Sequence, residues 1–149
     1  MIYQEVMGDI FTVPLDYTLV HCISRDCVMG KGIAKIFKDK YPHMQRSLRN
    51  RKEVHSPSGH PALHYYSPEK GKHNVISLVT KEKYFNKPTM NTLADSLNNL
   101  KLVCRNLNIN KLAMPLIGCG LDRLDWKDVN ILIKETFKDE DIDIRVCII

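Results

Sequence analysis

Apolar residues along the chain fall into short runs that alternate with longer amphipathic segments. The short runs, typical of strands, contain many β-branched residues and are bounded by polar or turn-forming residues. The run at 17–24 is apolar enough to be buried on both faces of a sheet. The segment PEKGKH separates two of the runs, and its composition predicts a turn. The six predicted strands cover residues 2–6, 17–24, 62–67, 74–80, 111–117 and 142–149.

The first amphipathic segment covers residues 30–40 and precedes Pro42, which cannot continue a helix. Its apolar residues recur at helical spacing, and residues 42–52 are predicted to form a further short helix. The stripe consists of Ile33, Ala34, Ile36 and Phe37.

Two longer helices are predicted in the second half, each beginning after a capping residue, Thr89 or Asp125. Strands that alternate with helices predict an α/β fold whose sheet is mostly parallel and flanked by helices. The expected buried stripes are Leu93, Leu97, Leu100, Cys104 and Leu107 in one helix, and Trp126, Val129, Leu132, Ile133 and Phe137 in the other.

Composition places the chain in the ordinary globular class, with 149 residues, 44% hydrophobic and 26% charged. We expect one domain over residues 1–149. No apolar run approaches the roughly 20 residues that cross a bilayer, and residues 1–10 lack the features of a signal peptide. Five irregularly spaced cysteines without a C-x-x-C pair predict reduced thiols and no zinc site. We therefore expect an intracellular protein, cytoplasmic or nuclear, without a membrane partner and by default monomeric.

The net charge of +5 is unevenly distributed, because residues 35–52 hold seven basic side chains and one acidic one, Asp39. A basic face favours anionic partners such as nucleotides or nucleic acid. A solvated helix face explains most of these side chains at least as well.

Glycine-rich or polar segments follow three predicted strands, at the sheet edge where open α/β sheets bind ligands. Gly30 and Gly32 precede a helix, whose free N–H groups attract phosphate. The spacing matches neither a P-loop nor the Rossmann pattern, which has glycine or alanine where Lys35 stands. Gly118 and Gly120 form a second such turn, and the two turns together favour a diphosphate clamp more than either turn does alone, with tight turns that bind no ligand as the alternative.

Two side chains near these turns are candidates for chemistry. Lys81 directly follows a buried strand, and Asp122 follows the second glycine turn. Asp125 suits the helix-cap position better, which leaves Asp122 without an evident structural role. An amine at the mouth of a phosphate site is a candidate nucleophile, with Lys83 as the alternative to Lys81.

These segments resemble the macro domain superfamily, and more closely its terminal ADP-ribose protein glycohydrolase branch. The matching stretches are GDIF (8–11), HCISRDCVMGKGIAKIFKDKYP (21–42), LVTKEKYFNKPT (78–89) and MPLIGCGLDRLDW (114–126). The resemblance implies a three-layer α/β/α sandwich with a mixed, mostly parallel sheet. It also implies that Asp9 binds the adenine amino group with help from the Ile10 backbone. The residues implied along the phosphates and distal ribose are Ser24, Gly30, Gly32, Ile33, Gly118, Cys119, Gly120 and Leu121.

The resemblance further implies a hydrolase that removes ADP-ribose from modified Glu and Asp side chains without a metal or other cofactor. The branch's catalytic lysine falls on Lys81 and its catalytic aspartate on Asp122, and some members also deacylate O-acetyl-ADP-ribose. Expected partners are ADP-ribose and mono-ADP-ribosylated proteins. Arg25 and Lys31 add positive charge beyond the family pattern, which extends the expectation to poly-ADP-ribose or ADP-ribosylated nucleic acid. The alternatives are a non-catalytic ADP-ribose reader, an ADP-ribose-1″-phosphate phosphatase, and an RNA- or DNA-binding domain that uses residues 35–52.

Overall fold

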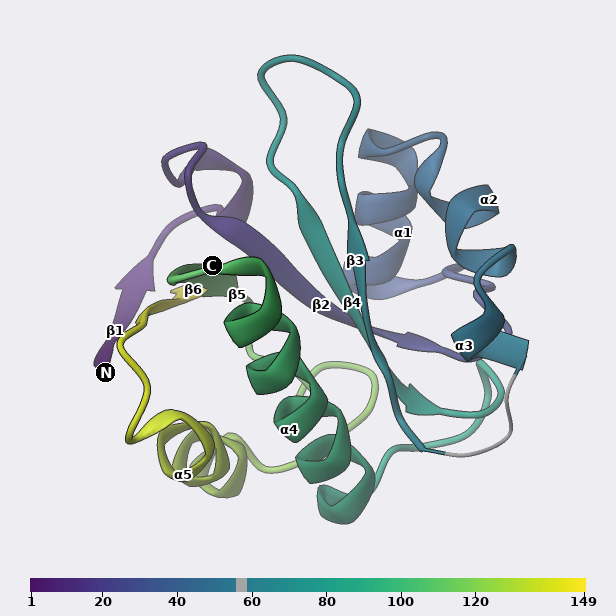
Figure 1. Cartoon of the computed structure of the whole chain (residues 1–149). Coiled ribbons are helices and arrows are strands. Elements are labelled where there is room, and N and C mark those ends of the chain that lie inside the picture. The colour runs from purple at the N-terminus through teal and green to yellow at the C-terminus, as the bar shows by residue number, and fades with distance from the viewer. Residues whose placement is uncertain (56–58) are drawn as a thin grey trace.

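A six-stranded sheet forms the centre of the protein, in the order β1-β6-β5-β2-β4-β3 (Figure 1). The computed structural model describes residues 1–55 and 59–149. Neighbouring strands are parallel except for β3, which pairs antiparallel with β4 at one edge. The predicted mixed, mostly parallel sheet is therefore confirmed. The strands are β1 (Ile2–Met7), β2 (Thr18–Ser24), β3 (Ala62–Tyr65), β4 (Val75–Lys81), β5 (Lys111–Met114) and β6 (Asp143–Ile148).

Helices cover both faces of this sheet, which gives the predicted α/β/α sandwich (Figure 1). Three short helices pack on one face: α1 (Gly32–Lys40), α2 (Met44–Arg49) and α3 (Lys52–His55). The longer helices α4 (Met90–Leu107) and α5 (Trp126–Phe137) pack on the other. A single 3-10 turn, η1 (Ile10–Thr12), follows β1.

Strand β2 lies inside the sheet and supplies apolar side chains to both layers of the core. Leu19 and Ile23 pack with Phe37 of α1, whereas Val20 packs with Leu97 of α4. All five side chains are buried, as expected for a strand between two helical layers.

The predicted caps of the two long helices are confirmed. Thr89 accepts a hydrogen bond from Thr92 N while the Thr92 hydroxyl accepts one from Thr89 N, which is a reciprocal capping box. The Asp125 carboxylate accepts from Lys127 N at the start of α5. Asp122 is therefore not needed as the cap of α5.

Several details of the predicted elements were wrong. The helix predicted from residue 30 begins at Gly32, whereas the short helix predicted within residues 42–52 is present as α2 and is followed by a second one, α3, that begins at Lys52. Ile36 lies 100° around the helix from its buried neighbour Phe37, beyond the part of the stripe that packs on the core, and its side chain is exposed. Leu107 is also exposed, because α4 ends there and the chain turns at Asn108 in the left-handed conformation. The strand predicted to reach residue 117 ends at Met114, since Pro115 has no N–H for the ladder.

All five cysteines are free, as predicted. Among the residues described, no helix is long and apolar enough to cross a membrane.

Candidate active site

A pocket of about 840 Å³ opens at the carboxyl ends of β2, β4 and β5. The loops that follow these strands provide most of its lining, together with Cys147, Ile148 and Ile149 at the end of β6. Parallel strands bring their carboxyl ends to one edge, so segments far apart in sequence meet there. Ten residues expected in the site line this pocket: Ser24, Gly30, Gly32, Ile33, Lys81, Gly118, Cys119, Gly120, Leu121 and Asp122.

Asp9 and Ile10 do not contribute to this lining. The Asp9 carboxylate accepts a hydrogen bond from Phe11 N at 3.0 Å and caps η1, and Ile10 is buried in the core. However, Gly8 N donates to Ile148 O at 2.9 Å, and Ile148 lines the pocket. Asp9 therefore lies next to the β6 end of the pocket.

Lys81 and Asp122 form an ion pair inside the pocket. Lys81 Nζ lies 2.7 Å from Asp122 Oδ1, and the side chains are only 13% and 16% exposed. Lys81 ends β4, so the sheet fixes its backbone. Lys83 is exposed and does not line the pocket. The geometry thus favours Lys81 over Lys83 as the amine of the site.

A tightly folded loop between β5 and α5 positions Asp122. Gly118 adopts φ +75°, a left-handed conformation that favours glycine. Leu124 N donates to Gly118 O at 2.7 Å, and Arg123 N donates to Gly120 O at 3.2 Å. A Cβ on Gly118 would meet Leu124 Cδ1 at 2.9 Å. The glycine is therefore required both for the backbone conformation and for close packing.

Asp26 connects the loop after β2 to the loop after β4. Its Oδ1 accepts hydrogen bonds from the Ser24 hydroxyl and, at 3.3 Å, from Val28 N. Its Oδ2 accepts from Tyr84 N at 2.9 Å. Burial raises the pKa of Asp26, but the hydrogen bonds from Ser24, Tyr84 and Val28 outweigh burial and leave the pKa below its usual value. The carboxylate is thus ionised at neutral pH and holds both loops.

The same loop after β2 contains two non-glycine residues in the left-handed conformation, Cys27 at φ 55° and Met29 at φ 51°. Such residues are strained and persist only where surrounding contacts hold them. Gln45 of α2 supplies such contacts, since its Nε2 donates to Cys27 O at 2.7 Å and to Val28 O at 3.1 Å. The loop backbone is therefore fixed before any ligand binds.

Three pocket residues from the β4–α4 loop were missed by the sequence reasoning: Tyr84, Phe85 and Lys87. Lys87 Nζ donates to Leu121 O at 2.7 Å and joins this loop to the loop after β5. Two adjacent aromatic residues in a polar loop were the signal that could have identified them.

Two of the cysteines that line the pocket, Cys22 and Cys119, are protonated at neutral pH. Burial, and next the nearby Asp122 carboxylate, raise the pKa of Cys22 to about 12. Burial raises the pKa of Cys119 to about 11, with a smaller contribution from Asp125. Because the thiolate is the nucleophilic form, neither of these two thiols is poised for covalent chemistry.

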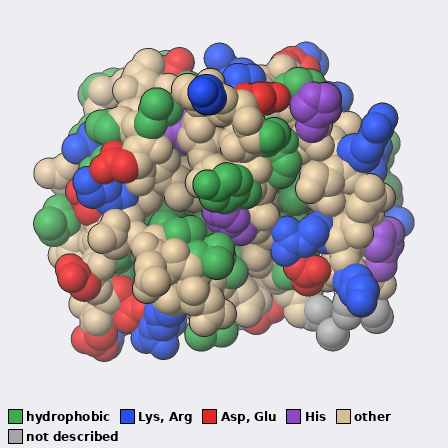
Figure 2. Space-filling view, turned by 45° about the horizontal axis from the view of Figure 1, so that its top comes forward, with side chains coloured by type: hydrophobic (Ala, Val, Ile, Leu, Met, Phe, Trp, Pro, Cys, Tyr) green, Lys and Arg blue, Asp and Glu red, His purple; other side chains and the backbone are tan. Residues whose placement is uncertain are grey.

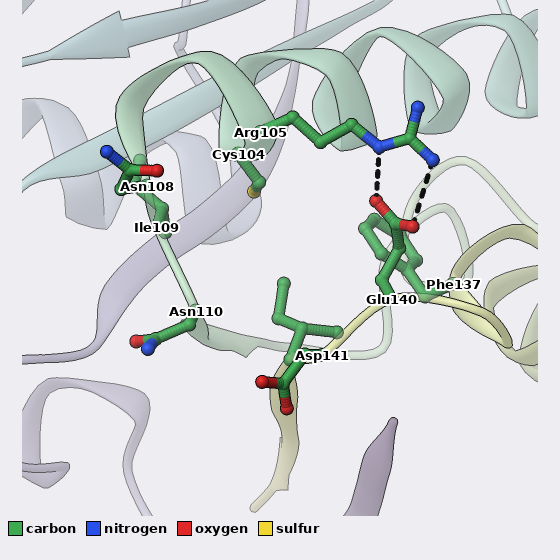
Figure 3. A pocket seen from close by; sticks show the side chains of 9 residues that line it. Cys104, Arg105, Asn108, Ile109, Asn110, Phe137, Glu140 and Asp141 are labelled. Carbon is green, nitrogen blue, oxygen red and sulfur yellow. Dashed lines mark hydrogen bonds and ion pairs between the residues drawn. The ribbon is translucent and has the colours of Figure 1, made fainter.

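Nothing else among the described residues resembles a reactive centre. No group of three or more His, Cys, Asp or Glu side chains there could hold a metal ion. A smaller pocket of about 370 Å³ lies between the C-terminal ends of α4 and α5 (Figure 3). Two of its charged residues pair with each other, with Arg105 Nε 2.6 Å and Nη2 2.9 Å from the two carboxylate oxygens of Glu140.

Basic side chains on the face drawn in Figure 2 are spread around its margin, with acidic side chains beside several of them. Some cations expected in a basic patch are also paired locally. Lys35 Nζ lies 2.8 Å from Asp39 Oδ2, and Arg51 pairs with Glu53. These pairs weaken the case for residues 35–52 as a nucleic-acid surface.

Comparison with known proteins decides the family of this chain. The sequence pattern of the Macro domain family matches residues 20–133. The chain belongs to the macro domain family. A Bos taurus protein named ADP-ribose glycohydrolase OARD1 is 42% identical over 141 residues, which cover 95% of this chain and 88% of that protein. A Mycobacterium tuberculosis protein named DNA ADP-ribosyl glycohydrolase is 32% identical over 133 residues, which cover 88% of this chain and 37% of that protein.

Solved structures show the same macro domain fold. The macrodomain of Mycobacterium tuberculosis DarG superposes with a TM-score of 0.87 at 26% identity, covering 99% of this chain and 97% of that one. The chain therefore has the same fold as a relative of low sequence identity. This is the macro domain fold that the sequence resemblance implied.

Proposed function

We propose that this macro domain is an ADP-ribose glycohydrolase that removes ADP-ribose from modified Glu and Asp side chains of proteins. The observation that carries the proposal is the contact between Lys81 Nζ and Asp122 Oδ1, 2.7 Å long, at one end of a preformed pocket. A module that only reads ADP-ribose needs no such pair. The names of the relatives with 42% and 32% identity support the same reaction class.

The two glycine turns are suited to hold the diphosphate. The N-terminus of α1 has no side-chain cap at Lys31, so its first N–H groups are available to phosphate oxygens. Gly118 and Gly120 present backbone from the opposite wall. With the diphosphate between these walls, the distal ribose reaches Lys81, and the adenine reaches the β6 end beside Asp9.

In the proposed reaction, Asp122 accepts a proton from Lys81, and the free amine attacks C1″ of the distal ribose. A C1″–N bond forms as the C1″–O bond to the modified carboxyl group breaks. The electron pair leaves with the Glu or Asp carboxylate, which takes the proton from Asp122. Water then attacks C1″, Asp122 accepts its proton, and the C1″–N bond breaks to release Lys81, which regains its proton from Asp122. The sum is the ester plus water giving the acid plus ADP-ribose.

A hydrolysis assay on a peptide with ADP-ribose on glutamate tests this function directly. We expect release of free ADP-ribose by the wild-type protein and none by Lys81→Ala. A reader module would bind ADP-ribose in calorimetry without turnover. A phosphatase or deacylase would instead act on ADP-ribose-1″-phosphate or O-acetyl-ADP-ribose and leave the peptide intact.

A further inference from the structure

The register between β2 and β4 changes immediately before Lys81. Ile23 pairs with Val79 and Ser24 pairs with Lys81, so Thr80 is one extra residue in β4. Thr80 is buried, and among the residues that the structure describes its hydroxyl has no hydrogen-bond partner. An extra residue of this kind disrupts the ladder locally and bends the strand. Contacts outside the ladder are therefore needed to define where Lys81 points.

Arg25 supplies such contacts from the position that directly follows β2. Its backbone N–H donates to Lys81 O at 2.9 Å. Its side chain forms an ion pair with Glu82, the next residue after Lys81, in which Arg25 Nε lies 2.6 Å from Glu82 Oε2. One residue thus holds both the main chain of Lys81 and the side chain of its neighbour.

The Arg25 guanidinium is also anchored to two further segments. Its Nη1 donates to Glu53 O of α3 at 3.1 Å, and its Nη2 donates to Gly59 O. The Arg25 side chain is only 12% exposed. Because a guanidinium is planar and its N–H groups point in fixed directions, these contacts set the position of Glu82 relative to α3 and Gly59.

Arg25 is not among the residues that line the pocket. Its effect on the reaction must therefore pass through the chain that it holds. The long side chain of Lys81 brings Nζ to 2.7 Å from Asp122 Oδ1, which lies on a different loop. This contact persists only while the end of β4 keeps its place relative to that loop. A displacement of about 1 Å can cost on the order of 10²-fold in rate.

We propose that Arg25 is a positioning residue for the Lys81 amine, holding the end of β4 so that Nζ stays beside Asp122 and reaches C1″ of the distal ribose. This rests on the proposed function and adds a residue that touches neither the ligand nor the reacting atoms. From the sequence, Arg25 was expected to attract a polyanionic substrate. The geometry directs its guanidinium to Glu82 and to two main-chain carbonyls.

The variants Arg25→Met and Arg51→Met separate positioning from stability. Arg51 is the matched control, because its Nη1 donates to His64 O at 3.0 Å and its Nε donates to Glu53 Oε2 at 3.1 Å, so it also joins α3 to a neighbouring segment. Methionine keeps an unbranched side chain and removes the guanidinium in both variants. Both should lower the unfolding temperature.

Activity is compared on a glutamate-modified peptide at a temperature where both variants are folded. We expect Arg25→Met to lower kcat about tenfold or more, and Arg51→Met to keep kcat within about twofold. In Arg25→Met, KM and the calorimetric Kd for ADP-ribose stay within about twofold, because the turns that hold the diphosphate are unchanged. Arg25→Lys retains a charge for Glu82 but lacks the planar fork, so it should recover part of kcat.

Equal losses of kcat in Arg25→Met and Arg51→Met, or wild-type kcat in Arg25→Met, would overturn the positioning role. If Arg25→Met does not fold, Glu82→Leu decides instead, because the Glu82 side chain is 53% exposed and its replacement is tolerated more readily. Lowered kcat with an unchanged Kd for ADP-ribose then supports the role, and unchanged kcat overturns it.

The proposed function and the positioning role can fail separately. If the wild-type protein leaves the peptide intact, the proposed function fails, and amide hydrogen exchange at residues 81–84 decides whether Arg25 holds this segment. Faster exchange there in Arg25→Met but not in Arg51→Met supports the role. Exchange at the wild-type rate in Arg25→Met overturns it.

Discussion

Lys81 and Asp122 are 41 residues apart in the chain, yet their side chains meet at 2.7 Å. Lys81 ends β4, and Asp122 lies in the loop after β5, two strands that are separated in the sheet by β2. The loops must therefore reach across the end of β2 to join. A contact of this kind depends on the whole sheet, and the proposed chemistry depends on the contact.

Asp122→Asn keeps the size of the side chain but cannot accept the proton of the Lys81 ammonium. We expect kcat on a glutamate-modified peptide to fall by about 10²–10⁴-fold, the usual contribution of a positioned acid or base. Lys83→Ala is the matched control, because this lysine is exposed outside the pocket, and it should keep kcat within about twofold. Comparable losses for both variants would contradict the assignment. Calorimetry with ADP-ribose should show that Asp122→Asn still binds.

Much of the architecture follows from short-range patterns in the sequence. The apolar run at 17–24 contains the buried strand β2, and the spacing of Leu93, Leu97 and Leu100 predicts the buried face of α4. Thr89 and Asp125 identify the starts of two helices through their side-chain oxygens. These signals come from residues that are close together in the sequence, so they can be recognised without knowledge of the fold.

The hydrogen bonds that hold the loops of the site could not be predicted from the sequence in this way. Asp26 accepts a hydrogen bond from Tyr84 N, 58 residues away in the chain, and Gln45 of α2 donates one to the carbonyl of Cys27. Such bonds depend on how helices and loops pack in three dimensions. The exposure of Ile36 has a related origin, because the tertiary packing of α1 decides which part of its apolar stripe is covered.

Gly118 and Gly120 provide a matched test of the loop that positions Asp122. Gly118→Ala introduces a Cβ at φ +75° and 2.9 Å from Leu124 Cδ1. We expect it to lower the free energy of unfolding by at least about 1–2 kcal/mol, from backbone strain alone. A Cβ on Gly120 meets nothing within 4 Å, so Gly120→Ala should change the free energy of unfolding by no more than about 0.5 kcal/mol. Urea denaturation of both variants measures the difference, and equal destabilisation would refute it.

His21 should make the protein less stable in mild acid. Burial lowers the pKa of His21 from 6.5 to about 3 in the folded state. Below pH 6.5 the unfolded chain therefore binds a proton that the folded protein does not bind. The free energy of unfolding should fall as pH drops from 6.5 towards 3, with a slope approaching about 1.4 kcal/mol per pH unit from this group.

Urea denaturation at pH 7 and pH 5 tests this dependence, with His21→Gln as the comparison. The variant removes the titrating ring, so its loss of stability between the two pH values should be smaller than that of the wild type. Identical losses would show that other groups cause the acid sensitivity.

Asp26→Asn should loosen both loops, because one amide oxygen cannot replace the two oxygens that accept from Val28 N and Tyr84 N. An unsatisfied partner costs about 1–3 kcal/mol, and we expect kcat on the peptide to fall along with stability. Asp39→Asn is the control, since Asp39 pairs with Lys35 at the exposed surface, where an ion pair contributes little to stability. If Asp26→Asn lowers stability and leaves kcat intact, its role is structural alone.

Denaturing mass spectrometry after incubation with ADP-ribose tests directly whether Lys81 is the nucleophile. The proposed mechanism predicts a covalent ADP-ribose adduct on the peptide that contains Lys81, and its absence in Lys81→Ala. An adduct that maps to Lys83, or full turnover by Lys81→Ala, would contradict the mechanism.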